Sequence, residues 1–97
     1  MRKIEKEMIQ AINEKKEMKK ANTEVFINSN GVFVKLYNTI IYADVKGKKY
    51  YSDGGWWTVT TRSRLYALGF EKGGKLQPQE KMYNLIWAGN VSGKLAA

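Results

Sequence analysis

Basic and aromatic side chains alternate at two places in this 97-residue chain. Three lysines surround a turn that leads into a pair of tyrosines, and two tryptophans precede two arginines after a Gly-Gly turn. Lys and Arg neutralise phosphates and release their counterions, and aromatic faces stack on unpaired bases. The pattern therefore predicts a surface for nucleic acid or another partner, with these candidate binding residues: Lys46, Lys48, Lys49, Tyr51, Trp56, Arg62 and Arg64.

The two tryptophans have a second interpretation, in which they are structural. In a strand, Trp57 and Val59 share one face, while Trp56 and Thr58 share the other. We therefore expect Trp57 in the core and Trp56 partly exposed.

The two arginines have a structural interpretation as well. Residues two apart on a helix lie about 200° from each other, so Arg62 and Arg64 cannot hold one phosphate together unless the helix begins after Arg62. Under this interpretation one of them pairs with Asp44 or Asp53.

Composition argues against catalysis. The chain has no cysteine and no histidine, which removes thiolate chemistry, the usual general base and the usual zinc ligands. Ser52 and Ser63 therefore lack a histidine that would activate them. The acidic residues show no spacing typical of a metal site. We expect a binding protein with no enzymatic activity, no cofactor and no metal.

The net charge and the hydropathy of the chain limit the classes of partner that we expect. The net charge is +8, from 17 Lys and Arg against 9 Asp and Glu, which favours nucleic acid or an acidic protein surface. No apolar run approaches the roughly 20 residues that cross a bilayer, and the N-terminus has no apolar export segment. We expect a cytoplasmic protein without a membrane partner.

The periodicity predicts an α+β fold in a single domain, residues 1–97. Apolar residues recur at helical steps over residues 2–20, so an amphipathic helix forms residues 1–20 and lies on the sheet. Its heptad-like spacing also permits a homodimer through this helix. Residues 24–59 predict an antiparallel meander of four or five strands. The strands cover residues 24–27, 32–37, 40–45, 49–52 and a short fifth at 56–59.

The remaining residues, 61–89, predict a helical C-terminal part. Thr60 or Thr61 caps a short helix that ends at Gly69. A second helix begins at Pro78 and continues to Gly89, although a buried strand over residues 82–88 also fits the pattern. Residues 90–97 are expected to be frayed.

The stretch from Gly55 to Leu68 resembles a group of small proteins from tailed bacteriophages with the pattern G-W-x-T-x-T-T-[K/R]-x-R-L-N-A-L. Upstream, those proteins carry L-H-G-N-x-I on a strand, where this chain has Leu36-Tyr37-Asn38-Thr39-Ile40-Ile41. The chain departs from the patterns at Tyr37, Asn38, Thr39 and Tyr66. The resemblance implies a phage protein with an accessory role in the infected bacterium, and it implies no reaction.

Two functions follow as predictions. The first is a small basic phage accessory protein that binds DNA or RNA without catalysis. The alternative is an inhibitor of a host defence or replication protein, of the anti-CRISPR or anti-restriction type, that acts by protein–protein binding. Six tyrosines are many for so small a core, and exposed tyrosines would suit such an interface.

Overall fold

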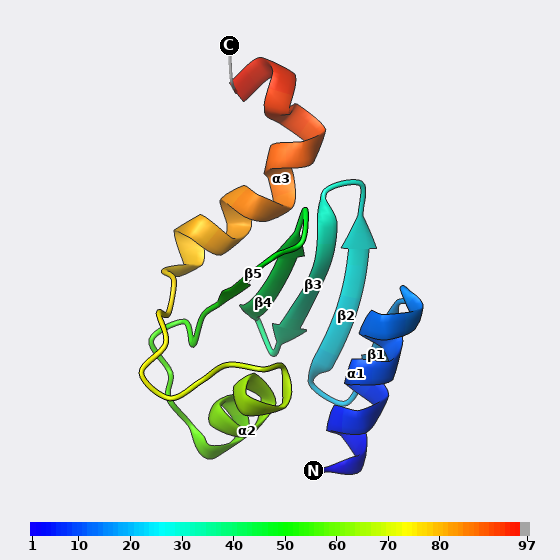
Figure 1. The fold of residues 1–97 in the computed structure, drawn as a ribbon, viewed down its shortest axis with the longest axis vertical. Helices are drawn as coiled ribbons and strands as arrows, with labels where there is room; N and C mark the ends of the chain where they lie inside the picture. Colours follow the sequence, from blue (N-terminus) through cyan, green and yellow to red (C-terminus); the bar gives the residue numbers. More distant parts are fainter. Residues whose placement is uncertain (96–97) are drawn as a thin grey trace.

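A five-stranded antiparallel sheet with a helix before it and two helices after it forms the fold (Figure 1). The computed structural model describes the backbone of residues 1–95 and the side chains of residues 1–87. The strands lie in chain order across the sheet, each antiparallel to the next. The fold is α+β, as predicted. Its elements are α1 (Lys3–Glu14), β1 (Met18–Lys20), β2 (Thr23–Asn28), β3 (Gly31–Leu36), β4 (Thr39–Val45), β5 (Lys48–Tyr51), α2 (Val59–Ala67) and α3 (Gln79–Leu95).

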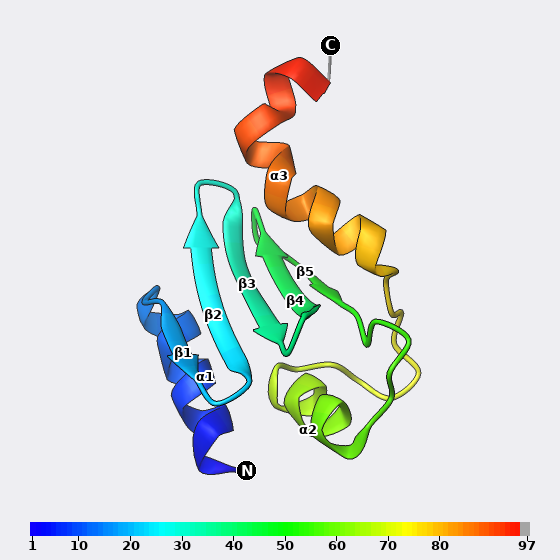
Figure 2. The ribbon, with the colours of Figure 1, turned by 180° about the vertical axis from the view of Figure 1, so that it is seen from behind.

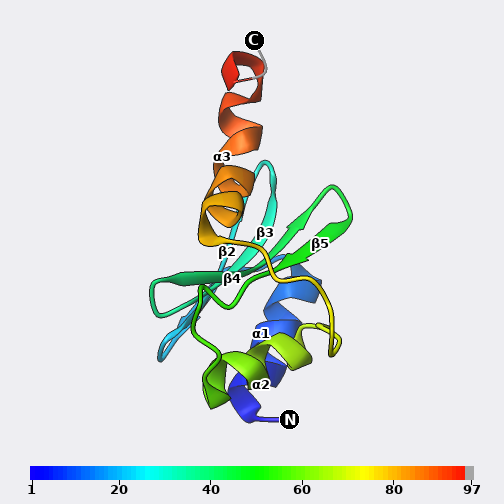
Figure 3. The same cartoon turned by 90° about the vertical axis from the view of Figure 1, so that its left-hand side faces the viewer.

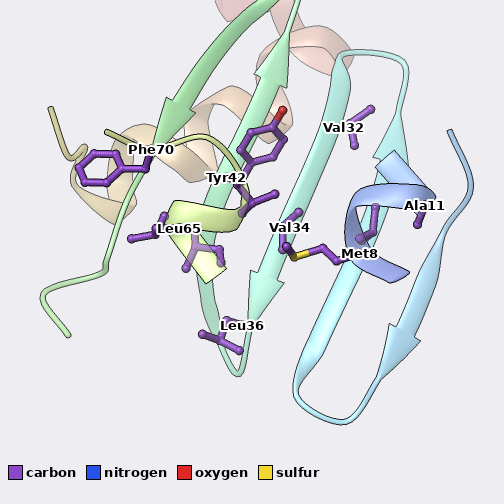
Figure 4. Close-up of a cluster of buried hydrophobic side chains, with 11 residues drawn as sticks. Met8, Ala11, Val32, Val34, Leu36, Tyr42, Leu65 and Phe70 are labelled. Atoms are coloured by element: carbon purple, nitrogen blue, oxygen red, sulfur yellow. The ribbon is translucent and has the colours of Figure 1, made fainter. Parts of the chain in front are cut away.

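The sheet has a buried layer on each face (Figure 3). Alternate residues of a strand point to opposite faces, so Val34 and Leu36 meet α1 and α2, whereas Phe33 meets α3. Met8 of α1 and Leu65 of α2 fill the first layer (Figure 4). Figure 2 views the sheet from the side of α3, whose Met82 and Ile86 form the second layer with Phe33, Ile40 and Ala43.

The first helix is shorter than predicted, and the short strand β1, which the sequence did not predict, follows it. Lys15 takes a left-handed conformation with φ 53° and ends α1. Met18 then pairs with Val25 at the edge of the sheet. In the sequence, Met18 continues the helical spacing of the apolar residues of α1. This spacing alone therefore does not show where the helix ends and the strand begins. Met8 and Ala11 of α1 are buried in the core that this helix forms with the chain's own sheet, as predicted.

The predicted strand at residues 56–59 is wrong, and so is the predicted cap. Gly54 and Gly55 have positive φ, and the amide of Trp56 donates to the carbonyl of Asp53 at 2.9 Å, which closes a turn. Thr58 then caps α2, because its Oγ1 accepts from the amide of Thr61 at 3.1 Å. The helix α2 therefore begins at Val59, earlier than a cap at Thr60 or Thr61 would place it.

The C-terminal helix is confirmed as a helix over residues 82–88 and continues to Leu95, past Gly89. Gln79 fixes its start, because its side chain bonds both the amide and the carbonyl of Ile40, at 2.8 and 2.7 Å. Residues 90–97 were expected to be frayed. Of these, residues 96–97 lie outside the described part of the chain. No helix within residues 1–95 is long and apolar enough to cross a membrane.

Candidate functional site

The candidate binding residues separate into two groups at opposite ends of β4. Lys46, Lys48 and Lys49 lie at or beside the turn that follows Val45. Trp56 lines a hollow of about 340 Å³ next to Thr39, where β4 begins. Strands rise about 3.3 Å per residue, so the seven residues of β4 keep the groups about 20 Å apart. The sequence predicted one surface, whereas the chain presents two.

The first group belongs to a lysine surface at the β5 edge of the sheet, defined as Lys46, Lys48, Lys49, Lys75 and Lys81. A groove of about 490 Å³ runs between β5 and the segment that follows α2, and Lys48, Lys49 and Lys75 line it together with Tyr50. The ammonium groups of Lys48 and Lys81 lie 5.3 and 5.6 Å from the centroid of the Tyr50 ring. β5 and α3 thus each direct a cation toward one tyrosine, and the loop before α3 adds Lys75 to the groove beside it. One carboxylate, that of Glu71, also lines the groove.

Tyr51, the aromatic residue that the sequence favoured here, has a packing role. Its hydroxyl donates to the carbonyl of Leu68 at 3.0 Å, and its ring contacts the rings of Tyr42 and Phe70. Burial raises the pKa of Tyr51, and the negative charges of Asp44 and Glu71 raise it further. Its phenol is therefore neutral at physiological pH. Tyr51 also lines the groove with Lys48, Lys49 and Lys75, but the ring that Lys48 and Lys81 contact is that of Tyr50.

Sequence reasoning missed Tyr50, Lys75 and Lys81. Tyr50 and Tyr51 are adjacent in the sequence, and only the register of β5, in which Tyr50 opposes Ala43, decides which ring meets which face. Lys75 and Lys81 reach the surface through a loop and the start of α3. No local pattern in the sequence indicates that Lys75 and Lys81 lie near Tyr50, because only the long-range fold brings them there.

Arg64 is buried and does not belong to a binding surface. Its side chain is 7% exposed, its Nη1 lies 2.8 Å from Oε2 of Glu5, and its Nε donates to Thr23. The predicted structural ion pair therefore exists, but its partner is Glu5 rather than Asp44 or Asp53. Arg62 points outward and is exposed, as expected for residues about 200° apart on a helix.

Glu5 is held as a carboxylate by the groups around it. Burial raises the pKa of Glu5, but hydrogen bonds from Ser63, the Arg2 amide and Arg64 outweigh burial and bring the pKa below its ordinary value. The Ser63 hydroxyl donates to Oε2 at 2.6 Å. These contacts join α1 to α2 and, through Arg64, to Thr23 of β2.

The second group lies in an aromatic patch, defined as Tyr37, Trp56, Trp57, Val59 and Tyr66. Trp56 is 68% exposed. Trp57 is 44% exposed, so the expectation that it lies in the core is wrong. Its ring meets those of Tyr66 and Phe70 edge-on, with both centroid distances 6.2 Å. Trp57 is therefore partly packed, whereas Trp56 lines the hollow together with Tyr37, Asn38 and Thr39.

The comparison with protein families identifies the chain. Residues 1–93 match the model of the family described as Kyanoviridae Gp96 protein. The chain belongs to this family of tailed-phage proteins. The predicted phage origin is thereby confirmed. Searches of curated proteins and of solved structures found no match.

Two further observations bear on this site. The segments that carried the phage resemblance in the sequence, residues 36–41 and 55–68, meet around the Trp56 hollow. Within the described part of the chain, no three carboxylate, histidine or cysteine side chains are grouped so that they could hold a metal ion.

Proposed function

We propose that this phage protein binds nucleic acid, without catalysis, through the lysine surface, in the cytoplasm of the infected bacterium. The observation that carries the proposal is the arrangement of Lys48 and Lys81 over the Tyr50 ring beside a groove that Lys49 and Lys75 also line. Cations that meet at one ring from a strand and a helix, with a further lysine from a loop in the adjoining groove, form a local positive field that attracts a phosphate backbone.

The ammonium groups of this surface are available to a ligand. None of its lysines forms an ion pair with another residue in the described part of the chain. The Tyr50 ring attracts two of them by cation–π contact, which limits their motion before a ligand arrives. The net charge of +8 adds a long-range attraction that weakens as salt rises.

The test is a titration of a labelled single strand of DNA, a duplex and an RNA with the full chain, at low and physiological salt. We expect binding that persists at physiological salt and weakens in a Lys48→Glu, Lys81→Glu double variant. Each lost phosphate contact should reduce the salt slope by about 0.7 for single strands and about 0.9 for duplex DNA.

The control must match the change in charge. Lys3→Glu, Lys6→Glu alters two exposed lysines of α1, on the opposite side of the sheet from α3. If both double variants weakened nucleic-acid binding equally, the binding would come from non-specific attraction by net charge. That result would contradict a defined site. Absence of binding to all three nucleic acids at physiological salt would remove the proposal.

A second candidate function is inhibition of a host defence or replication protein. The observation that favours it is the aromatic patch, because large exposed aromatic side chains are typical of protein interfaces. Its test is retention of a host protein by the immobilised chain and loss of that protein with Trp56→Ala. Equal retention by this variant would exclude the patch as the inhibitory surface.

A further inference from the structure

We infer that the aromatic patch is a docking surface for an apolar segment of another protein that carries acidic side chains. This inference rests on the second candidate function and is independent of nucleic-acid binding by the lysine surface. It adds the chemistry of the partner, which follows from the exposure, the arrangement and the charge of the patch.

The exposure of the patch is large for apolar side chains that lie together. Tyr37 and Val59 are each 62% exposed, and Trp56 is 68% exposed. Trp57 and Tyr66 also keep more than two-fifths of their surface in water. Large contiguous apolar patches are rare on monomeric proteins unless they bind something. Tryptophan, tyrosine and arginine are also the residue types that contribute most to binding at protein interfaces.

The patch has an ordered arrangement. Val59, Arg62 and Tyr66 follow one another at i, i+3 and i+7, so they share the outer face of α2. Trp57 precedes the helix, and its ring reaches along this face to meet that of Tyr66, in the last turn of α2, edge-on. Beyond Trp57, the Trp56 hollow adds a concave end that could take one apolar side chain of the partner.

The charge around the patch is positive. Residues 54–70 contain no acidic residue, and Arg62 is exposed without an ion pair in the described part of the chain. The first turn of α1 borders α2, because Glu5 contacts Ser63 and Arg64 and accepts a hydrogen bond from the Arg2 amide. This end of α1 carries the exposed Arg2 and Lys3. Among the nearby carboxylates, Asp53 accepts a hydrogen bond from the amide of Gly55, and Glu5 is buried and paired with Arg64. Glu24 lines a hollow with Tyr37, and Lys19 and Lys35 line the same hollow. Complementary charge in a partner is therefore negative.

Two other occupants fit less well. A second copy of the chain would bring Arg62, Arg2 and Lys3 against the same positive end of its neighbour, and like charges at an interface oppose association. Nucleic acid prefers interfaces that are strongly positive and polar. The patch itself presents five large apolar side chains and Arg62, with Arg2 and Lys3 only at its border, whereas the lysine surface presents five lysines.

The experiment uses the full chain and a labelled synthetic peptide of about 15 residues in which Leu and Phe recur every three or four residues and Glu fills positions between them, so that the peptide is amphipathic as a helix. One control peptide carries Lys in place of each Glu. Another keeps each Glu and carries Ser in place of Leu and Phe. Fluorescence polarisation at physiological salt measures the three affinities, with Trp56→Ala and Arg62→Glu as test variants and Lys48→Glu as the control with the same change in charge.

We expect the acidic apolar peptide to bind about tenfold more tightly than either control peptide, and Trp56→Ala and Arg62→Glu each to weaken it by about fivefold or more. Lys48→Glu should have a smaller effect than Arg62→Glu. Both altered residues of the test variants are exposed, so unchanged circular dichroism and thermal unfolding establish that the variants fold.

The other outcomes overturn the inference. Equal binding of the Lys peptide would exclude acidic chemistry, and equal binding of the Ser peptide would reduce the effect to attraction by net charge. Absence of binding by the acidic apolar peptide would also overturn the inference. The second candidate function would still be supported in that case if the chain retained a host protein through Trp56. Self-association lost in Trp56→Ala would assign the patch to a second copy. Oligonucleotide binding that depends on Arg62 more than on Lys48 would assign it to nucleic acid.

Discussion

Glu5 and Arg64, which are 59 positions apart in the sequence, form an ion pair of 2.8 Å in the interior of the protein. Their side chains are 2% and 7% exposed. Ser63 and Thr23 complete the network by bonding the carboxylate and the guanidinium, so both charges have partners. A buried charge without a partner is costly. The pair therefore fixes the position of α2 relative to α1 and, through α2, the outward direction of Arg62.

Loss of Arg64 should destabilise the fold strongly. Arg64→Leu leaves the Glu5 carboxylate buried with fewer partners, and removing one member of a buried pair costs about 3–5 kcal/mol. The matched control is Lys20→Leu, which breaks the exposed pair with Glu7 and should cost at most about 1 kcal/mol. Urea denaturation of both variants measures the difference. Equal losses would mean that water reaches Glu5 and that the network contributes little.

The lowered pKa of Glu5 predicts how stability depends on pH. Glutamate titrates near pH 4.3 in an unfolded chain, and its pKa is lower in the fold because the hydrogen bonds from Ser63, Arg2 and Arg64 outweigh burial. The contribution of this group is therefore complete above the unfolded pKa and is lost as the pH falls through the folded pKa. In Glu5→Gln this contribution is absent. The gap in unfolding free energy between the two proteins should narrow as the pH falls from about 5 to about 3, and a constant gap would contradict the lowered pKa.

The sequence predicted the strands better than the site. Turn residues such as Asn30 and Gly31 are local signals, and the hairpin that they predict joins β2 to β3. The left-handed turn at Lys15 has no glycine to mark it, so the first helix was extended too far. The partner of Arg64 lies on a helix at the other end of the chain. No local pattern indicates that contact, and none decides between Tyr50 and Tyr51 as the ring that meets the lysines.

Thr58 should contribute more to stability than Thr60, although the sequence favoured Thr60 or Thr61 as the cap. The Thr58 Oγ1 accepts from the Thr61 amide and donates to the Thr61 hydroxyl. Thr58→Ala removes this cap and should cost about 1 kcal/mol. Thr60→Ala, within the first turn of α2, should change stability by less than about 0.5 kcal/mol. Thermal unfolding of the two variants measures this order, and the reverse order would place the start of the helix later.

The two adjacent tryptophans should differ in what their removal costs. Trp57 packs edge-on against Tyr66 and Phe70, and aromatic pairs contribute about 0.5–1.5 kcal/mol each, so Trp57→Ala should cost about 1–3 kcal/mol. Trp56 is the more exposed ring, and Trp56→Ala should stay within about 0.5 kcal/mol of the parent protein. Denaturant unfolding gives both values. With the third tryptophan, the exposed Trp87, replaced by Phe in both proteins, acrylamide should quench Trp56 in the Trp57→Phe variant more strongly than Trp57 in the Trp56→Phe variant. If Trp56→Ala proved the more costly change, the ring would belong to the core, and its loss could not be used to map a binding surface.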